Sequence, residues 1–179
     1  LVKRVRTKTE VPLIFMTYYN PVFSYGNERF FKNASEAGID GIIVPDVPFE
    51  ESEEIRSVSK KYGVDLINMI APTSDERIEK IAKAAEGFLY CVSSLGVTGV
   101  REKITTNVGE MIEKVRKVSD IPCAIGFGIS NPEQAHTMAQ VSDGVIVGSA
   151  IVRLIAESGN EAVEKVSSYV KEMKAAANR

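Results

Sequence analysis

Six short apolar runs, separated by charged amphipathic stretches, limit the possible folds of this chain more than any other feature. The runs carry few charges and do not alternate between apolar and polar residues, which is typical of strands buried on both faces of a parallel sheet. They cover Pro12–Met16, Gly41–Pro45, Asp65–Ile70, Gly87–Val92, Pro122–Phe127 and Asp143–Val147. The pattern predicts an α/β fold with parallel strands.

The stretches that join and follow these runs have the composition of amphipathic helices. Two of the helix starts carry clear signals: Ser74 precedes Asp75, and Asn131 precedes Pro132 at the first helical position. The segment from Leu1 to Lys8 is similar to the last turns of another helix. Strand-plus-helix units of about 20–35 residues indicate right-handed βα repeats. The predicted helices cover Asn27–Ala37, Glu51–Tyr62, Asp75–Ala84, Gly109–Val118, Pro132–Val141, Ser149–Glu157 and Glu161–Ala176.

Two architectures contain such repeats, a doubly wound open sheet and a (β/α)8 barrel. An open sheet has edge strands, which are usually more polar, whereas all six runs here look equally buried and glycine-rich strand ends recur. This comparison favours the barrel. A barrel needs eight strands and typically about 250 residues, while this chain has 179 residues and six runs. We therefore expect residues 1–179 to form a single incomplete TIM-barrel domain, with strands 3–8 and their outer helices, that lacks the first two βα units.

Composition excludes several classes of function. The formal net charge of −2 gives no electrostatic reason to expect nucleic acid or an anionic membrane as partner. No apolar run approaches the eighteen or so residues of a membrane span, and no signal peptide is visible. Cys91 and Cys123 lie in strand-like runs, where cysteine is usually a small buried hydrophobe, and His136 is the single histidine. We expect no metal, no cofactor and no disulfide, and a cytoplasmic location.

The last two apolar runs end in glycine and pass directly into helices. One end reads Gly126-Phe127-Gly128 and the other Gly148-Ser149. In TIM barrels, the loops after strands 7 and 8 commonly bind phosphate with the help of a short helix N-terminus. Glycine removes the Cβ that would hold a phosphate away from the backbone amides. The sequence therefore predicts a phosphate-binding end formed by residues 126–130 and 147–152.

A polar segment of about fifteen residues follows the fourth run, from Ser93 to Asn107. Loops of this length in compact domains are often lids over a site. We interpret residues 93–107 as a lid loop in which Gly96 and Gly99 act as hinges and Thr98 offers a hydroxyl group to the site.

Five strings together resemble the tryptophan synthase α-chain family: YNPVFSYG (19–26), VPDVPFEES (44–52), SSLGVTG (93–99), GFGIS (126–130) and VGSAIV (147–152). The resemblance runs from about Val11 to the C-terminus. It implies a TIM-barrel lyase of tryptophan biosynthesis that cleaves indole-3-glycerol phosphate to indole and glyceraldehyde 3-phosphate. It also implies an α2β2 heterotetramer in which a β-chain condenses the indole with serine on its own pyridoxal phosphate.

The resemblance assigns roles to individual residues. Gly128, Gly148 and Ser149 match phosphate-binding positions, and Phe127 matches a residue that lines the pocket. Gly99 closes over the phosphate in the family. The other substrate-binding assignments are Thr98, which matches a lid threonine that contacts the catalytic aspartate, Tyr90, which lies beside the substrate, and Tyr18 at the end of strand 3. The residues expected to face the β-chain are Asn20, Pro21, Asp46 and Pro48.

The family's catalytic glutamate and aspartate match no position here, because they correspond to the region upstream of Leu1. The reaction needs an acid to protonate the indole carbon and a base to remove protons, so we expect this chain alone to be inactive. Asp46 lies at a strand end between two prolines, which indicates an organiser of the loop or a partner-facing residue. Two alternatives remain open: another phosphate–sugar barrel enzyme, against which the SSLGVTG segment argues, and a non-catalytic remnant that binds a phosphate ligand or a partner.

Overall fold

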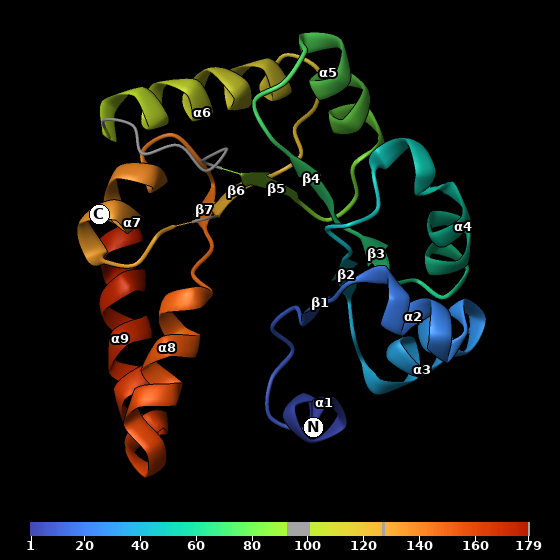
Figure 1. Cartoon of the computed structure of the whole chain (residues 1–179), viewed down its shortest axis with the longest axis horizontal. Helices are drawn as coiled ribbons and strands as arrows, with labels where there is room; N and C mark the ends of the chain where they lie inside the picture. Colours follow the sequence, from blue (N-terminus) through green and yellow to red (C-terminus); the bar gives the residue numbers. More distant parts are fainter. Residues whose placement is uncertain (93–100, 127, 179) are drawn as a thin grey trace. The chain divides into compact units, whose positions relative to one another are not determined.

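The computed structural model describes residues 1–92, 101–126 and 128–178, with the backbone alone for 101–107. The chain divides into two compact units (Figure 1). The first comprises Leu1–Met69 and Ala84–Phe88, and the second comprises Ile70–Lys83 and Leu89–Arg179. Each unit contains parallel strands and helices.

The first unit is built on a three-stranded sheet with the order β1-β2-β3. Both pairs are parallel, with Ile14 opposite Gly41 and Ile42 opposite Leu66. The strands are β1 (Ile14–Met16), β2 (Gly41–Ile43) and β3 (Asp65–Leu66), and the helices are α1 (Val2–Arg6), α2 (Tyr19–Tyr25), α3 (Asn27–Ala37), the 3-10 turn η1 (Phe49–Glu51) and α4 (Glu53–Lys61).

The core of the first unit lies where the central strand meets α2, α3 and α4. Ile42 on β2 is fully buried, as are Val22 on α2 and Phe31 on α3. Ile55 on α4 adds a fourth apolar side chain to the same cluster. The apolar faces of the three helices therefore converge on β2, as expected for helices that cover a parallel sheet.

Arg6 ties the first helix to this unit. Its guanidinium group donates to the carbonyl groups of Gly38 at 2.7 Å and Val11 at 2.8 Å, and it pairs with the carboxylate of Asp40. Asp40 also accepts a hydrogen bond from the amide of Leu13 at 2.6 Å. One side chain thus fixes α1 against the end of α3 and the segment that leads into β1.

The second unit carries β5, β6 and β7 of a four-stranded sheet with the order β4-β5-β6-β7; of β4, Ile70 belongs to this unit, whereas Asn68 and Met69 belong to the first. Side chains of β5, β6 and α6 form its core, including Leu89, Ile125, Ile112 and Val115, all at most 1% exposed. The strands are β4 (Asn68–Ile70), β5 (Leu89–Val92), β6 (Cys123–Gly126) and β7 (Gly144–Val145), and the helices are α5 (Asp75–Ala84), α6 (Arg101–Arg116), α7 (Pro132–Ala139), α8 (Ser149–Ser158), the 3-10 turn η2 (Gly159–Glu161) and α9 (Ala162–Ala177).

Much of the sequence prediction is confirmed. The chain has an α/β fold with parallel strands, and α3 and α5 have the predicted bounds. The segment at the N-terminus is helical, as α1. Asn131 caps α7, because its side chain accepts a hydrogen bond from the amide of Gln134, and Pro132 occupies the first helical position.

Two expectations about the strands were wrong. The run Asp65–Ile70 forms two short strands, because Asp65 and Leu66 pair with β2 while Asn68–Ile70 joins the other sheet. The six runs are also not equally buried. Exposure is high in β1, where Met16 is 57% exposed, and intermediate in β7. Both strands are the last members of their sheets in the described part of the chain, so one side of each has no neighbouring strand.

Two expectations about the helices were also wrong. Helix α6 begins at Arg101 and not at Gly109, so residues 101–107 are helical where a loop was predicted. Arg, Glu and Lys are good helix formers, and their polarity alone does not indicate a loop. Helix α2 was not predicted. Its Pro21 lies in the first turn, where the missing N–H has no intrahelical partner to lose.

Within the described residues, no helix combines the length and the apolar character that crossing a bilayer requires.

The first unit should lose stability when a buried side chain at the centre of its sheet is shortened. We expect Ile42→Ala to lower the free energy of unfolding by about 2–5 kcal/mol, because the side chain is fully buried and leaves a cavity. Val11→Ala is the control, since Val11 is 63% exposed and should change the value by less than about 0.5 kcal/mol. Urea unfolding followed by circular dichroism measures both. Equal effects would contradict the assigned core.

Candidate functional site

The register of β5, β6 and β7 places the predicted phosphate-binding segments at one edge of a sheet. Val92 lies opposite Gly126, and Ile125 lies opposite Val145. The amide of Ile146 continues the ladder by donating to the carbonyl group of Ile125 at 2.7 Å. Because the strands are parallel, their carboxyl ends meet at the same edge. Ile125 and Val145 are partners, and Gly128 and Gly148 each lie three positions after one of them. The two glycine-rich ends therefore leave the sheet side by side.

Tyr90 lies over Gly126 at this edge. Its side chain comes from β5 and is 7% exposed. A Cβ atom on Gly126 would overlap the phenol ring and its hydroxyl group, so this close approach requires glycine. Burial raises the pKa of the Tyr90 phenol above its ordinary value. The phenol is therefore neutral at physiological pH and has an O–H group to donate.

Gly128 turns the chain after β6. Its φ of +82° lies in the left-handed region, where residues with a side chain are strained. Ile129 follows it and is buried, which anchors the turn on the core. The backbone of Gly128 is exposed at the surface, so its peptide groups are accessible.

The N-terminus of α7, which follows this turn, is closed by its own side chains. The Oδ1 atom of Asn131 accepts a hydrogen bond from the amide of Gln134 at 2.9 Å, and the Oε1 atom of Gln134 accepts one from the amide of Ser130 at 2.8 Å. This reciprocal arrangement satisfies amides that would otherwise be free. The end of α7 therefore has less capacity to bind an anion.

The N-terminus of α8 is different. No described side chain caps it, and its N-cap residue Gly148 and first residue Ser149 are both exposed. An α-helix leaves its first amides without intrahelical partners, and its dipole attracts negative charge there. Gly148 has a negative φ of −120°, and a Cβ atom there would meet nothing within 4 Å among the described residues. The local fold thus does not demand glycine, while the missing side chain leaves the helix end open to an anion.

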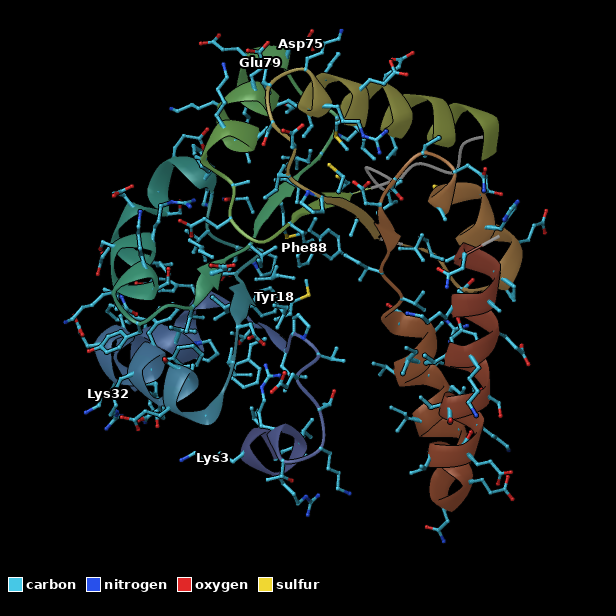
Figure 2. The ribbon with its side chains drawn as sticks, turned by 180° about the vertical axis from the view of Figure 1, so that it is seen from behind. Lys3, Tyr18, Lys32, Asp75, Glu79 and Phe88 are labelled. Carbon is cyan, nitrogen blue, oxygen red and sulfur yellow. The ribbon has the colours of Figure 1, made fainter. Side chains whose placement is uncertain are left out.

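The residues expected to face a partner lie in the first unit. Tyr18, which was predicted to bind substrate, also lies in this unit, two positions after β1 (Figure 2). Its side chain is 68% exposed. Both carboxylate oxygens of Asp46 accept a hydrogen bond from the amide of Tyr19, at 3.0 and 3.1 Å. Asp46 therefore caps α2 and connects it to the loop after β2, as an organiser of the loop would. The other three residues of this set are exposed: Asn20, Pro21 and Pro48.

Asp65 is a further carboxyl group with a perturbed pKa. Burial raises this pKa, and the neighbouring charges of Glu86 and Asp40 add to the effect. Asp65 begins β3 and lies opposite Gly41 at the start of β2. The amino ends of barrel strands serve stability, whereas catalysis takes place at the carboxyl ends. Its position therefore argues against a role in proton transfer.

Several predicted features lie outside the described residues. These are Thr98, Gly99 and Phe127, together with residues 93–100 of the predicted lid. Their assigned roles stay predictions. In the part of the chain that the structure describes, no group of three or more His, Cys, Asp or Glu side chains could hold a metal ion. The ring of His136 contacts the carbonyl group of Ala176 at 3.2 Å, which links α7 to α9.

Sequence reasoning missed two contacts at these sites. The approach of Tyr90 to Gly126 joins residues on two strands, and the bond from Tyr19 to Asp46 spans 27 positions. The first could have been found by aligning the two apolar runs in parallel, because this places Gly126 two residues beyond the partner of Tyr90 on the same face. The second has no local signal, because its two residues are 27 positions apart.

The contact between Tyr90 and Gly126 should appear as energetic coupling. We expect Gly126→Ala alone to lower the free energy of unfolding by about 1–3 kcal/mol, because the new methyl group overlaps the phenol. In the double variant with Tyr90→Ala the overlap is removed. The change in the free energy of unfolding of the double variant should then differ from the sum of the changes in the two single variants by about 1 kcal/mol or more. Additive effects in a urea-unfolding cycle would show that the two residues do not touch.

Comparisons with known proteins agree with this geometry. The family model described as tryptophan synthase alpha chain matches residues 1–178. A solved structure of tryptophan synthase subunit alpha from Campylobacter jejuni superposes with a TM-score of 0.86 at 36% identity, covering 94% of this chain and 67% of that one. A structure of the tryptophan synthase α2β2 complex from Pyrococcus furiosus gives a TM-score of 0.85 at 35% identity, covering 97% and 71%.

Curated relatives show the same likeness in sequence. The tryptophan synthase alpha chain of Lacticaseibacillus casei is 44% identical over 176 residues, which are 98% of this chain and 66% of the relative. That of Geobacillus kaustophilus is 51% identical over 156 residues, which are 87% of this chain and 58% of the relative. The 179 residues thus span about two thirds, or less, of the length of these relatives. On these matches, the chain belongs to the tryptophan synthase α-chain family.

Proposed function

We propose that this chain takes part in the cleavage of indole-3-glycerol phosphate to indole and glyceraldehyde 3-phosphate, and that it holds the phosphate group of the substrate. The observation that carries the proposal is the uncapped N-terminus of α8, which lies beside the turn at Gly128 on a shared sheet edge. Exposed amides at a helix N-terminus, flanked by glycine, are a recurrent phosphate site. Membership of the family supports the choice of substrate.

In this proposal the phosphate accepts hydrogen bonds from the first amides of α8 and from the hydroxyl group of Ser149. Gly148 and Gly128 let the anion approach the backbone, since neither carries a side chain. Gly99 closes over the bound phosphate, and Phe127 lines the pocket. The role proposed for the helix end rests on charge, because the positive end of the α8 dipole attracts the negative charge of the phosphate ester.

Tyr90 would lie against the remainder of the substrate. Its phenol is buried, neutral and fixed above Gly126, so it can form an uncharged wall beside the reacting carbon. Tyr18 and the lid residue Thr98 complete the proposed set of substrate-binding residues. These residues position the substrate, and none of them is assigned the transfer of a proton.

We further propose that residues 1–179 correspond to strands 3–8 of a TIM barrel and that the acid and the base lie outside them. The chain matches about two thirds of the relatives' length. Two carboxyl groups of the described residues are unsuited to the role: Asp46 caps α2, and Asp65 lies at the amino end of its strand. The reaction needs both a proton donor and a proton acceptor.

The loops around α2 and after β2 would face a tryptophan synthase β-chain in an α2β2 assembly. The exposed residues Asn20, Pro21 and Pro48 would supply this surface, and Asp46 holds the two segments together. The related Pyrococcus furiosus structure is described as an α2β2 complex, which supports this choice of partner. We place the assembly in the cytoplasm, in keeping with the two free cysteines, Cys91 and Cys123.

The phosphate site can be tested with one added charge. We expect Gly148→Asp to weaken the binding of inorganic phosphate at least about tenfold, because a carboxylate at the N-cap repels the anion and takes up its donors. The same carboxylate should leave thermal stability unchanged or slightly raised, because aspartate is a favourable N-cap residue. Titration followed by phosphorus NMR, together with thermal unfolding, measures both effects.

Pro132→Asp is the matched control, since it adds the same charge at the first position of α7, whose N-terminus is already closed. Phosphate binding in this control should stay within about twofold of the wild-type value. Equal loss of binding in the two variants would mean that the charge acts at long range, and it would remove the assignment to α8.

The activity itself is tested by following the release of indole. We expect the 179-residue chain alone to release indole at least about 10⁴-fold more slowly than the same chain supplied with the strand–helix units that it lacks relative to a full-length family member. General acid–base assistance contributes about 10²–10⁴-fold per group. Equal rates with and without the added units would place the acid and the base within residues 1–179, and Asp46 would then be the first residue to substitute.

A further inference from the structure

The C-terminal helix reaches the turn after β6 with one hydroxyl group. The side chain of Tyr169 on α9 donates a hydrogen bond to the carbonyl group of Ser130 at 2.9 Å, across 39 positions of the sequence. Both residues belong to the second unit. Burial raises the pKa of the Tyr169 phenol above its ordinary value, so the group is protonated at neutral pH and can donate. The bond thus joins α9 to the segment that leads from Gly128 into α7.

Two other contacts hold the same turn. Ile129 is 5% exposed and lies in the core. The amide of Ser130 donates to the Oε1 atom of Gln134 at 2.8 Å, while the carbonyl group of Ser130 is fixed by Tyr169. Gly128 has a positive φ of +82° and no side chain to restrict it. The direction of the peptide groups after Gly128 therefore depends on these contacts.

Helix α9 also contacts the helix that begins at the proposed phosphate site. It packs against α8 and against α7 (Figure 1). The ring of His136 on α7 contacts the carbonyl group of Ala176 on α9 at 3.2 Å. A single helix therefore contacts both helices that leave the sheet edge, and through Tyr169 it also contacts the turn between β6 and α7. This places α9 where it can fix the position of the turn relative to α8.

We propose that Tyr169 is a positioning residue for phosphate binding. Its hydroxyl group holds the turn at Gly128 so that the turn and the N-terminus of α8 lie against the same phosphate group. Tyr169 acts through Ser130 and does not touch the ligand. Without the bond the turn samples further orientations, and the affinity falls with the fraction of molecules that keep the competent one. The inference rests on the proposed phosphate site, to which it adds a residue from a third helix.

Removal of the hydroxyl group alone tests the proposal. We expect Tyr169→Phe to weaken the binding of inorganic phosphate about three- to tenfold, which is the effect of one neutral hydrogen bond on an equilibrium. His136→Phe is the matched control, because it removes a contact between α7 and α9 and leaves the bond to Ser130 in place. Phosphate affinity in the control should stay within about 1.5-fold of the wild-type value. Titration followed by phosphorus NMR measures both affinities, and thermal unfolding checks that both variants are folded.

The position of the turn can be followed without any ligand. In the free chain, the amide of Ser130 should exchange with solvent at least about threefold faster in Tyr169→Phe than in the wild type, because the turn opens more often. In His136→Phe the same amide should exchange within about twofold of the wild-type rate. Amide exchange measured by NMR gives both rates.

A kinetic measurement separates positioning from a loss of stability. It uses the chain supplied with the strand–helix units that it lacks relative to a full-length family member. There, Tyr169→Phe should raise the KM for indole-3-glycerol phosphate about three- to tenfold and leave kcat within about twofold. The phosphate group takes no part in bond breaking, so it is held equally in the bound substrate and in the transition state. A loss of folded enzyme would lower kcat instead.

Three outcomes would overturn the inference. The first is unchanged phosphate affinity in folded Tyr169→Phe. The second is an equal loss of affinity in Tyr169→Phe and His136→Phe, because the bond would then serve only to pack α9. The third is an unchanged exchange rate of the Ser130 amide in free Tyr169→Phe.

The variant Gly148→Asp distinguishes this inference from the proposed function. If Gly148→Asp leaves phosphate binding unchanged, the proposed site at α8 fails and the inference fails with it. If Gly148→Asp weakens binding and Tyr169→Phe does not, the site stands and this inference alone fails.

Discussion

The parallel register of β5, β6 and β7 is the constraint on which the candidate site depends. It brings the carboxyl ends of three strands to one edge, so that the turn at Gly128 and the start of α8 are neighbours although they are 20 positions apart in the chain. A shift of one residue in the pairing would turn each side chain to the opposite face. It would also move Tyr90 away from Gly126.

The two helices that leave this edge show how similar elements come to differ in function. Both follow a strand that ends near glycine, and both direct an N-terminus toward the same region. Side chains of Asn131 and Gln134 satisfy the amides at the start of α7, whereas α8 begins at Gly148 without a capping side chain. The difference is one of hydrogen bonding and is fully local, because it depends on the residues of each helix start.

Sequence patterns predicted the parts of the fold that depend on local or repetitive information. The buried runs indicated parallel strands, and Asn131 with Pro132 located the start of α7. The patterns failed where a feature depends on contacts between segments that are distant in the sequence. Periodicity did not show that Ile14–Met16 lies at an edge, since an apolar run reads the same with one neighbouring strand or two. Nor did it show that Asp46 caps α2, because that bond joins the start of a helix to a loop 27 positions away in the sequence. The five strings predicted the family, and they did so through their combination.

The closed end of α7 has a consequence for the selection of ligands. With one helix start occupied by its own side chains, the described part of this edge offers a single position for a strong anion, at α8. In the proposed site, a ligand with one phosphate group would place its charge there, and its uncharged remainder would lie against the phenol of Tyr90. A bisphosphate would bring a second dianion toward amides that already have hydrogen-bond partners. No new hydrogen bonds would then offset the free energy needed to remove water from the second phosphate. The hydrogen bonds between Asn131, Gln134 and Ser130, which look like mere helix capping, would thus act as a filter for singly phosphorylated compounds.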